Sequence, residues 1–181
     1  MIFAAGVVLL FFLTLIPYHL YDSGQLHYFL YALHKLQPEV LSRDWLVTQT
    51  ANPHPFFAEA IALLSSLDNL PLALFAVHAA QFLFLIIGIF SLTQIFSKDS
   101  RTPIVVFSLL LFYFSDGIGQ STLYSSIVQP EDLAKLFYLF SLSALLEEKI
   151  TRTWIFLGLT TLFDVLSGLE ALCGVGLDLR Y

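Results

Sequence analysis

Charge is scarce in this sequence. Only 12% of its 181 residues are Asp, Glu, Lys or Arg, whereas an ordinary soluble domain has roughly 25%. Lys and Arg together number 8 and Asp and Glu 14, which gives a net charge of −6. A surface that binds nucleic acid needs clustered Lys and Arg to neutralise phosphates. We therefore exclude nucleic acid as a partner.

Metal-binding and disulfide-forming residues are also few. Cys173 is the only cysteine, which excludes a disulfide framework and a cysteine-based zinc site. Its simplest interpretation is a small apolar residue inside a helix. His27 and His34 stand roughly 10 Å apart if they share a helix, too far to bind one ion. The sequence predicts no metal site and no cofactor.

Apolar residues are abundant and occur in long runs. They make up 57% of the chain, and the mean hydropathy is +0.80. A span needs about 20 apolar residues to cross a hydrocarbon core of about 30 Å. The sequence predicts an all-α polytopic membrane protein with a single transmembrane domain over residues 1–181. About five spans are expected, near residues 2–21, 72–96, 103–116, 132–147 and 153–177. The third and fourth are short, which leaves open whether they cross fully.

The segment 18–70 between the first two spans is expected to carry two helices that lie in the membrane interface. In Gln25–Gln37, apolar residues recur at helical spacing while histidines fall on another face. Phe56–Leu67 follows a proline-rich step and is too short to cross. Trp45 between them is interpreted as an interfacial anchor.

The basic residues predict the orientation. Lys98 and Arg101 lie in one short loop and Lys149 and Arg152 in another, whereas 115–131 has no basic residue. The positive-inside rule then puts the first two loops and the N-terminus in the cytoplasm. Segment 18–70 is predicted to be extracytoplasmic.

Three polar motifs occur in order along that segment. They are Tyr21-Asp22-Ser23-Gly24, Ser42-Arg43-Asp44-Trp45 and Asn52-Pro53-His54-Pro55-Phe56-Phe57. In this order, between a first span and a short helix, they resemble the start of bacterial GT-C glycosyltransferases, polytopic enzymes akin to protein O-mannosyltransferases. The resemblance covers about residues 1–70 by motif. Such enzymes have many more spans, so we interpret the chain as an N-terminal portion located in the bacterial plasma membrane.

The resemblance implies an activity and a set of residues. The activity is sugar transfer from a polyprenyl-phosphate donor at the extracytoplasmic face. Asp22 and Asp44 correspond to the acidic loop residues and are the catalytic candidates. A carboxylate can take the acceptor's proton, and a guanidinium suits a phosphate. The candidate substrate-binding residues are Arg43, His54, Glu131 and Asp132.

Each acidic residue also has a purely structural interpretation. Asp22 can mark the membrane exit or begin a turn, and Asp44 can pair with Arg43 or cap a short helix. Glu131 and Asp132 stand at a helix start, where carboxylates offset unpaired amides. Glu131 is also spaced to face Lys135.

Asp164 and Glu170 fall inside the predicted last span. They are either functional intramembrane acids or part of a tail that is not native to the fold. The alternative functions are a non-enzymatic integral membrane subunit or transporter fragment, and an inactive gene remnant.

Overall fold

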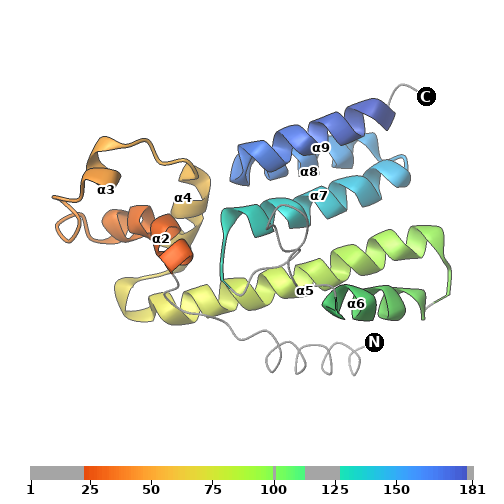
Figure 1. Ribbon diagram of the computed structural model, residues 1–181, viewed down its shortest axis with the longest axis horizontal. Helices are drawn as coiled ribbons and strands as arrows, with labels where there is room; N and C mark the ends of the chain where they lie inside the picture. Colours follow the sequence, from red (N-terminus) through yellow and green to blue (C-terminus); the bar gives the residue numbers. More distant parts are fainter. Residues whose placement is uncertain (1–22, 100, 113–126, 179–181) are drawn as a thin grey trace. The chain divides into compact units, whose positions relative to one another are not determined.

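The computed structural model describes residues 23–99, 101–112 and 127–178 (Figure 1). These residues form mainly helices, and none of them forms a β-strand, which confirms the all-α class for this part of the chain. The chain divides into two compact units. The first runs to Leu83 and takes in Ile127–Gln129, and the second contains the rest, from Phe84 onward.

The first unit contains three short helices before the long helix α5. They are α2 (Ser23–Leu36), α3 (Trp45–Gln49) and α4 (Pro55–Leu64), followed by a 3₁₀ turn, η1 (Leu67–Asn69). Helices α2 and α4 confirm that the two predicted segments are helical, except that the second ends at Leu64 rather than Leu67. Their location in a membrane interface stays a prediction. Pro55 occupies the first turn of α4, where its missing N–H costs nothing.

Helices α2 and α4 pack against each other. Phe29 and Phe57 are both buried, and their rings stack with centroids 6.3 Å apart. At the edge of this contact, Lys35 forms an ion pair with Glu59. Phe56, Leu63 and Leu64 point away from the contact and remain exposed.

Helix α5 (Leu70–Phe96) has 27 residues and is the only helix in the described part of the chain that is long and apolar enough to cross a membrane. Its bounds agree with the predicted helix at 72–96, and by length and composition it could cross a membrane. Its polar His78 and Gln81 are fully buried, whereas Leu72 and Phe84 are at least half exposed.

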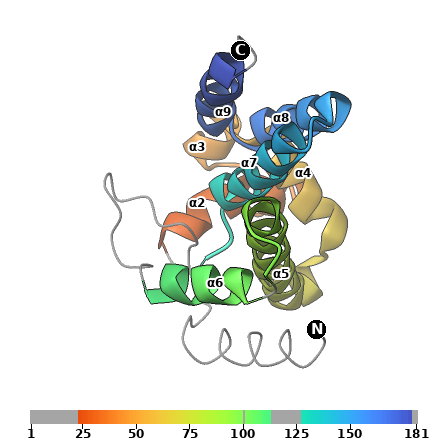
Figure 2. The same ribbon diagram turned by 90° about the vertical axis from the view of Figure 1, so that its right-hand side faces the viewer.

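The second unit contains the rest of α5 and four further helices. They are α6 (Thr102–Phe112), α7 (Pro130–Leu146), α8 (Ile150–Phe163) and α9 (Val165–Asp178). Helix α8 runs back along α7 in the opposite direction, and α9 then turns back along α8 and also contacts α7 (Figures 1 and 2). Two ring pairs join α7 to α8, namely Phe137 with Phe163 and Phe140 with Phe156, at 5.6 and 5.5 Å between centroids.

The turn between α7 and α8 closes α7 with a left-handed residue. Glu148 has φ 59°. The N–H of Lys149 donates to the Ala144 carbonyl at 2.8 Å and the N–H of Glu148 to that of Leu145 at 2.9 Å. This is the Schellman pattern, in which glycine is the usual left-handed residue.

The lengths of α6 to α9 correct the predicted number of membrane spans. The expected span at 153–177 is not continuous, because Asp164 separates α8 from α9 and each of these has 14 residues. Helix α6 has 11 described residues and α7 has 17. Five spans are therefore not supported. The predicted first span, 2–21, lies outside the described residues.

Candidate functional site

The candidate residues fall into three groups. Arg43, Asp44 and His54 belong to the first unit, and Glu131 and Asp132 to the second. Asp22 lies outside the described residues. The second and third motifs thus lie in the same compact unit, and their relation to the other acids stays a prediction.

Asp44 is the N-cap of α3. Its Oδ1 accepts hydrogen bonds from the N–H groups of Leu46 at 2.9 Å and Val47 at 3.4 Å. Its carbonyl oxygen accepts from both the N–H and the hydroxyl of Thr48, at 3.0 and 2.7 Å. An isolated helix of five residues is unstable in water, so this cap is a principal local support of α3. Of the two structural interpretations of Asp44, the helix cap is the one observed.

Arg43 and Trp45 flank the cap on the surface. Arg43 is exposed, and the indole of Trp45 is 69% exposed although it is apolar. An exposed tryptophan beside an exposed arginine is the composition expected at a membrane interface. The capped turn therefore presents both side chains outward.

Tyr31, which no sequence motif marks, holds this turn to α2. Its side chain is 8% exposed, and its hydroxyl donates to the Leu46 carbonyl at 3.1 Å. The hydroxyl also lies 2.7 Å from Thr50 Oγ1 and 3.5 Å from the carbonyl of Ala51. A buried tyrosine needs a partner for its O–H. The need of a buried tyrosine for a hydrogen-bond partner was the only sequence feature that could have indicated this role of Tyr31.

His54 precedes α4 and is held by its backbone and by its ring. Its N–H donates to Asn52 Oδ1 at 2.9 Å. The imidazole meets the ring of Tyr28 edge-on, with centroids 5.4 Å apart. The Asn-Pro-His-Pro motif is therefore an ordered entry to α4, and substrate binding by His54 stays a prediction.

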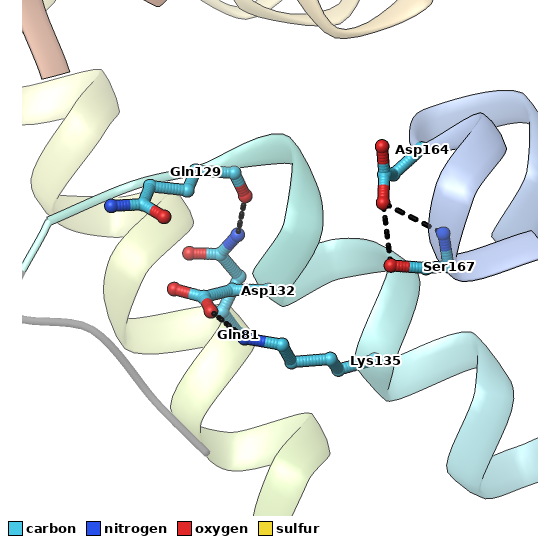
Figure 3. Close-up of polar contacts among 6 residues, drawn as sticks. All are labelled: Gln81, Gln129, Asp132, Lys135, Asp164 and Ser167. Carbon is cyan, nitrogen blue, oxygen red and sulfur yellow. Dashed lines mark hydrogen bonds and ion pairs between the residues drawn. The ribbon is translucent and has the colours of Figure 1, made fainter. Parts of the chain in front are cut away.

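Glu131 and Asp132 lie in the first turn of α7, after Pro130, as expected. Asp132 is buried, and its Oδ1 pairs with Lys135 Nζ at 3.5 Å (Figure 3). Lys135 was expected to face Glu131. Among the described residues it pairs with Asp132 instead, so that expectation was wrong. Glu131 is half-buried.

Asp164 caps α9 at the break between α8 and α9. It is 7% exposed, and its Oδ2 accepts from the N–H of Ser167 at 2.9 Å and from its hydroxyl at 2.5 Å (Figure 3). Its own N–H donates to the Thr160 carbonyl at 3.0 Å, so Asp164 also closes α8. A carboxylate at a helix N-terminus is stabilised by the helix dipole. This structural role accounts for an acid that the sequence analysis treated as functional or non-native.

No group of three or more His, Cys, Asp or Glu side chains in the described residues is arranged to hold a metal ion. Comparison with protein-family models, with curated proteins and with solved structures found no match.

Proposed function

We propose that the chain is an integral membrane protein and the N-terminal portion of a GT-C-like glycosyltransferase. The observation that carries this proposal is the capped turn at 43–45, which presents Arg43 and Trp45 on the surface while Tyr31 anchors it. Sugar transfer is proposed to take place at the extracytoplasmic face of a bacterial plasma membrane.

The membrane location is supported by the polar side chains of α5. His78 and Gln81 are buried together with Leu74 and Phe82, whereas Leu72 and Phe84 are exposed. Water-soluble helices bury their apolar side and expose their polar side. In lipid, polar side chains face the protein interior instead.

The proposed chemistry assigns different roles to the two aspartates. Asp22 takes the proton of the acceptor hydroxyl as the sugar leaves the lipid phosphate. Arg43, exposed beside an interfacial tryptophan, binds that phosphate as negative charge develops on it. Asp44 uses its carboxylate to cap α3, so we give it a positioning role and leave Asp22 as the base.

Sugar transfer by membranes that contain the complete gene product tests this assignment. Asp22→Asn is expected to abolish transfer while expression and membrane insertion stay unchanged. Glu39→Gln is the matched control, because Glu39 is an exposed acid of the same segment, and it is expected to transfer normally. Full transfer by Asp22→Asn would remove Asp22 from catalysis.

Arg43→Gln separates phosphate binding from folding. We expect it to raise KM for the polyprenyl-phosphate sugar, since the lost guanidinium contacts the donor. Arg43→Lys is expected to restore part of the affinity, because the charge returns without the planar fork. An unchanged KM in Arg43→Gln would contradict donor binding by Arg43.

A non-enzymatic membrane subunit is the second candidate, and α4 favours it. Phe56, Leu63 and Leu64 are exposed along this helix, and the Leu63 side chain is 83% exposed. A partner helix would cover them. Under this function, purification in mild detergent recovers a stoichiometric partner, which Leu63→Glu releases. A monodisperse lone chain would count against it.

A further inference from the structure

We infer that α8 and α9 form a helical hairpin that enters the bilayer from the side of the α7–α8 turn and returns to that side, with lipid acyl chains covering its outer face. The inference rests on the proposed membrane location. It replaces the predicted span at 153–177, whose two ends would lie on opposite sides of the membrane.

The length of the helices argues for a return rather than a crossing. Each has 14 residues, which corresponds to about 21 Å. A hydrocarbon core of about 30 Å is too thick for either helix alone. Asp164, at the tip, is the only residue between them.

The buried positions of the α7–α8–α9 group are occupied mostly by small and polar side chains. Among the buried described residues of these helices, only Leu136 and Leu157 have large apolar side chains. The other buried residues are Pro130, Asp132, Ala134, Ser141, Ser143, Ala144, Thr153, Thr160, Gly168 and Ala171, together with Asp164 between the helices. Small residues that let backbones approach are typical of helix contacts in membranes.

The outer face of the hairpin is apolar. Its exposed large apolar residues are Ile150, Trp154, Ile155 and Leu162 on α8 and Val165, Leu166, Leu169 and Leu172 on α9. On a water-soluble monomer, a contiguous apolar face of this kind marks a contact with a partner or with a membrane. Acyl chains are the solvent that suits this arrangement, because they cover apolar groups and leave polar groups to pair inside the protein.

The charged residues agree with this direction of entry. Glu147, Glu148, Lys149 and Arg152 are all exposed at the start of α8, and Trp154 follows them where an interfacial aromatic belongs. Between Trp154 and Gly174, the only exposed charged residue is Glu170. Glu170 stands four residues before Gly174, whose added Cβ would lie 3.2 Å from the Tyr138 hydroxyl of α7.

At the tip, one oxygen of the Asp164 carboxylate is hydrogen-bonded within the chain. Asp164 Oδ2 receives both hydrogen bonds of Ser167, and the side chain is buried (Figure 3). Next to it, Gly168 lets α9 approach Thr161 so closely that an added Cβ would lie 2.6 Å from the Thr161 Cα. The hairpin is therefore tightest where it would reach deepest.

Site-directed cysteine labelling tests the path of the chain. In a Cys173→Ser background, Lys149→Cys and Asp178→Cys mark the two ends of the hairpin in the full-length protein in sealed membrane vesicles of known orientation. A charged, impermeant maleimide is expected to label both positions from the same side. Labelling from opposite sides would restore the single span and overturn the hairpin while leaving the membrane location intact.

The native Cys173 and Trp154 test the lipid contact. Cys173 is exposed on α9, so we expect the charged maleimide to react with it only after denaturation. The Trp45→Phe variant leaves Trp154 as the only tryptophan, and vesicles of bromine-labelled phosphatidylcholine are expected to quench most of its fluorescence. Rapid labelling of Cys173 or unquenched Trp154 would overturn lipid coverage. A chain recovered folded in the aqueous fraction would overturn the proposed membrane location as well.

Discussion

Two glycines in neighbouring helices provide a matched pair for testing the hairpin's packing. Gly158 on α8 is exposed, and a Cβ added there meets nothing within 4 Å. A Cβ added at Gly168 on α9 would lie 2.6 Å from Thr161 Cα and 2.7 Å from Thr161 Cβ. Carbon atoms normally approach to about 3.5–4.0 Å. Alanine at 168 therefore forces α9 away from the α8 backbone by about 1 Å.

The two alanine substitutions are expected to change the free energy of unfolding in opposite directions. Gly158→Ala removes the helix cost of glycine and is expected to stabilise the protein by up to about 1 kcal/mol. Gly168→Ala gains the same helix preference, but overpacking against a backbone costs about 1–3 kcal/mol. We expect Gly168→Ala to be less stable than Gly158→Ala by about 1–3 kcal/mol, since the helix preference cancels between the two variants.

Unfolding in mixed micelles measures the difference. Each variant is titrated with a denaturing detergent, and the loss of helical circular dichroism gives the midpoint. We expect the highest midpoint for Gly158→Ala, an intermediate one for the wild type and the lowest for Gly168→Ala. Equal midpoints for the two alanine variants would refute the close approach of α8 and α9.

Three further substitutions probe contacts described above. Asp164→Ala removes the acceptor for Ser167 and is expected to lower the free energy of unfolding by about 1–2 kcal/mol, whereas a midpoint like wild type would mean that the cap contributes nothing. Tyr31→Phe removes the hydroxyl that binds Leu46, and we expect faster proteolysis within residues 38–53 without loss of the α2–α4 contact; unchanged cleavage would contradict the anchoring role. Glu148→Gly relieves a left-handed residue and is expected to raise stability by up to about 1 kcal/mol, a gain that a lower unfolding midpoint would rule out.

The helices that the sequence predicted well are those with a simple pattern. Helix α5 follows from an apolar run with no charged residue, and α2 from apolar residues at helical spacing with histidines on another face. Both patterns persist whatever the rest of the chain does. The local cap at Asp44 was also among the interpretations that the sequence allowed, because an N-cap needs only its own neighbours.

The break at Asp164 was missed because it has no proline or glycine to mark it. The residues on both sides of the break are mostly apolar, so hydropathy averaged over 153–177 predicts one continuous span. The informative detail was the spacing of Asp164 and Ser167, an N-cap residue followed three positions later by a hydrogen-bond donor. Tyr31 was missed for a different reason, since its partners at 46–51 come from a turn whose path depends on tertiary contacts.

The cap at Asp164 has a consequence for how the chain is made. Its carboxylate obtains its hydrogen-bond donors from Ser167, three residues later in the chain. While the ribosome has released α8 but not α9, the acid is unpaired, and an unpaired charge enters hydrocarbon only at a cost of about 2.5–3.5 kcal/mol. We therefore expect α8 to wait at the interface during translation and to insert together with α9, against an α7 that is already present.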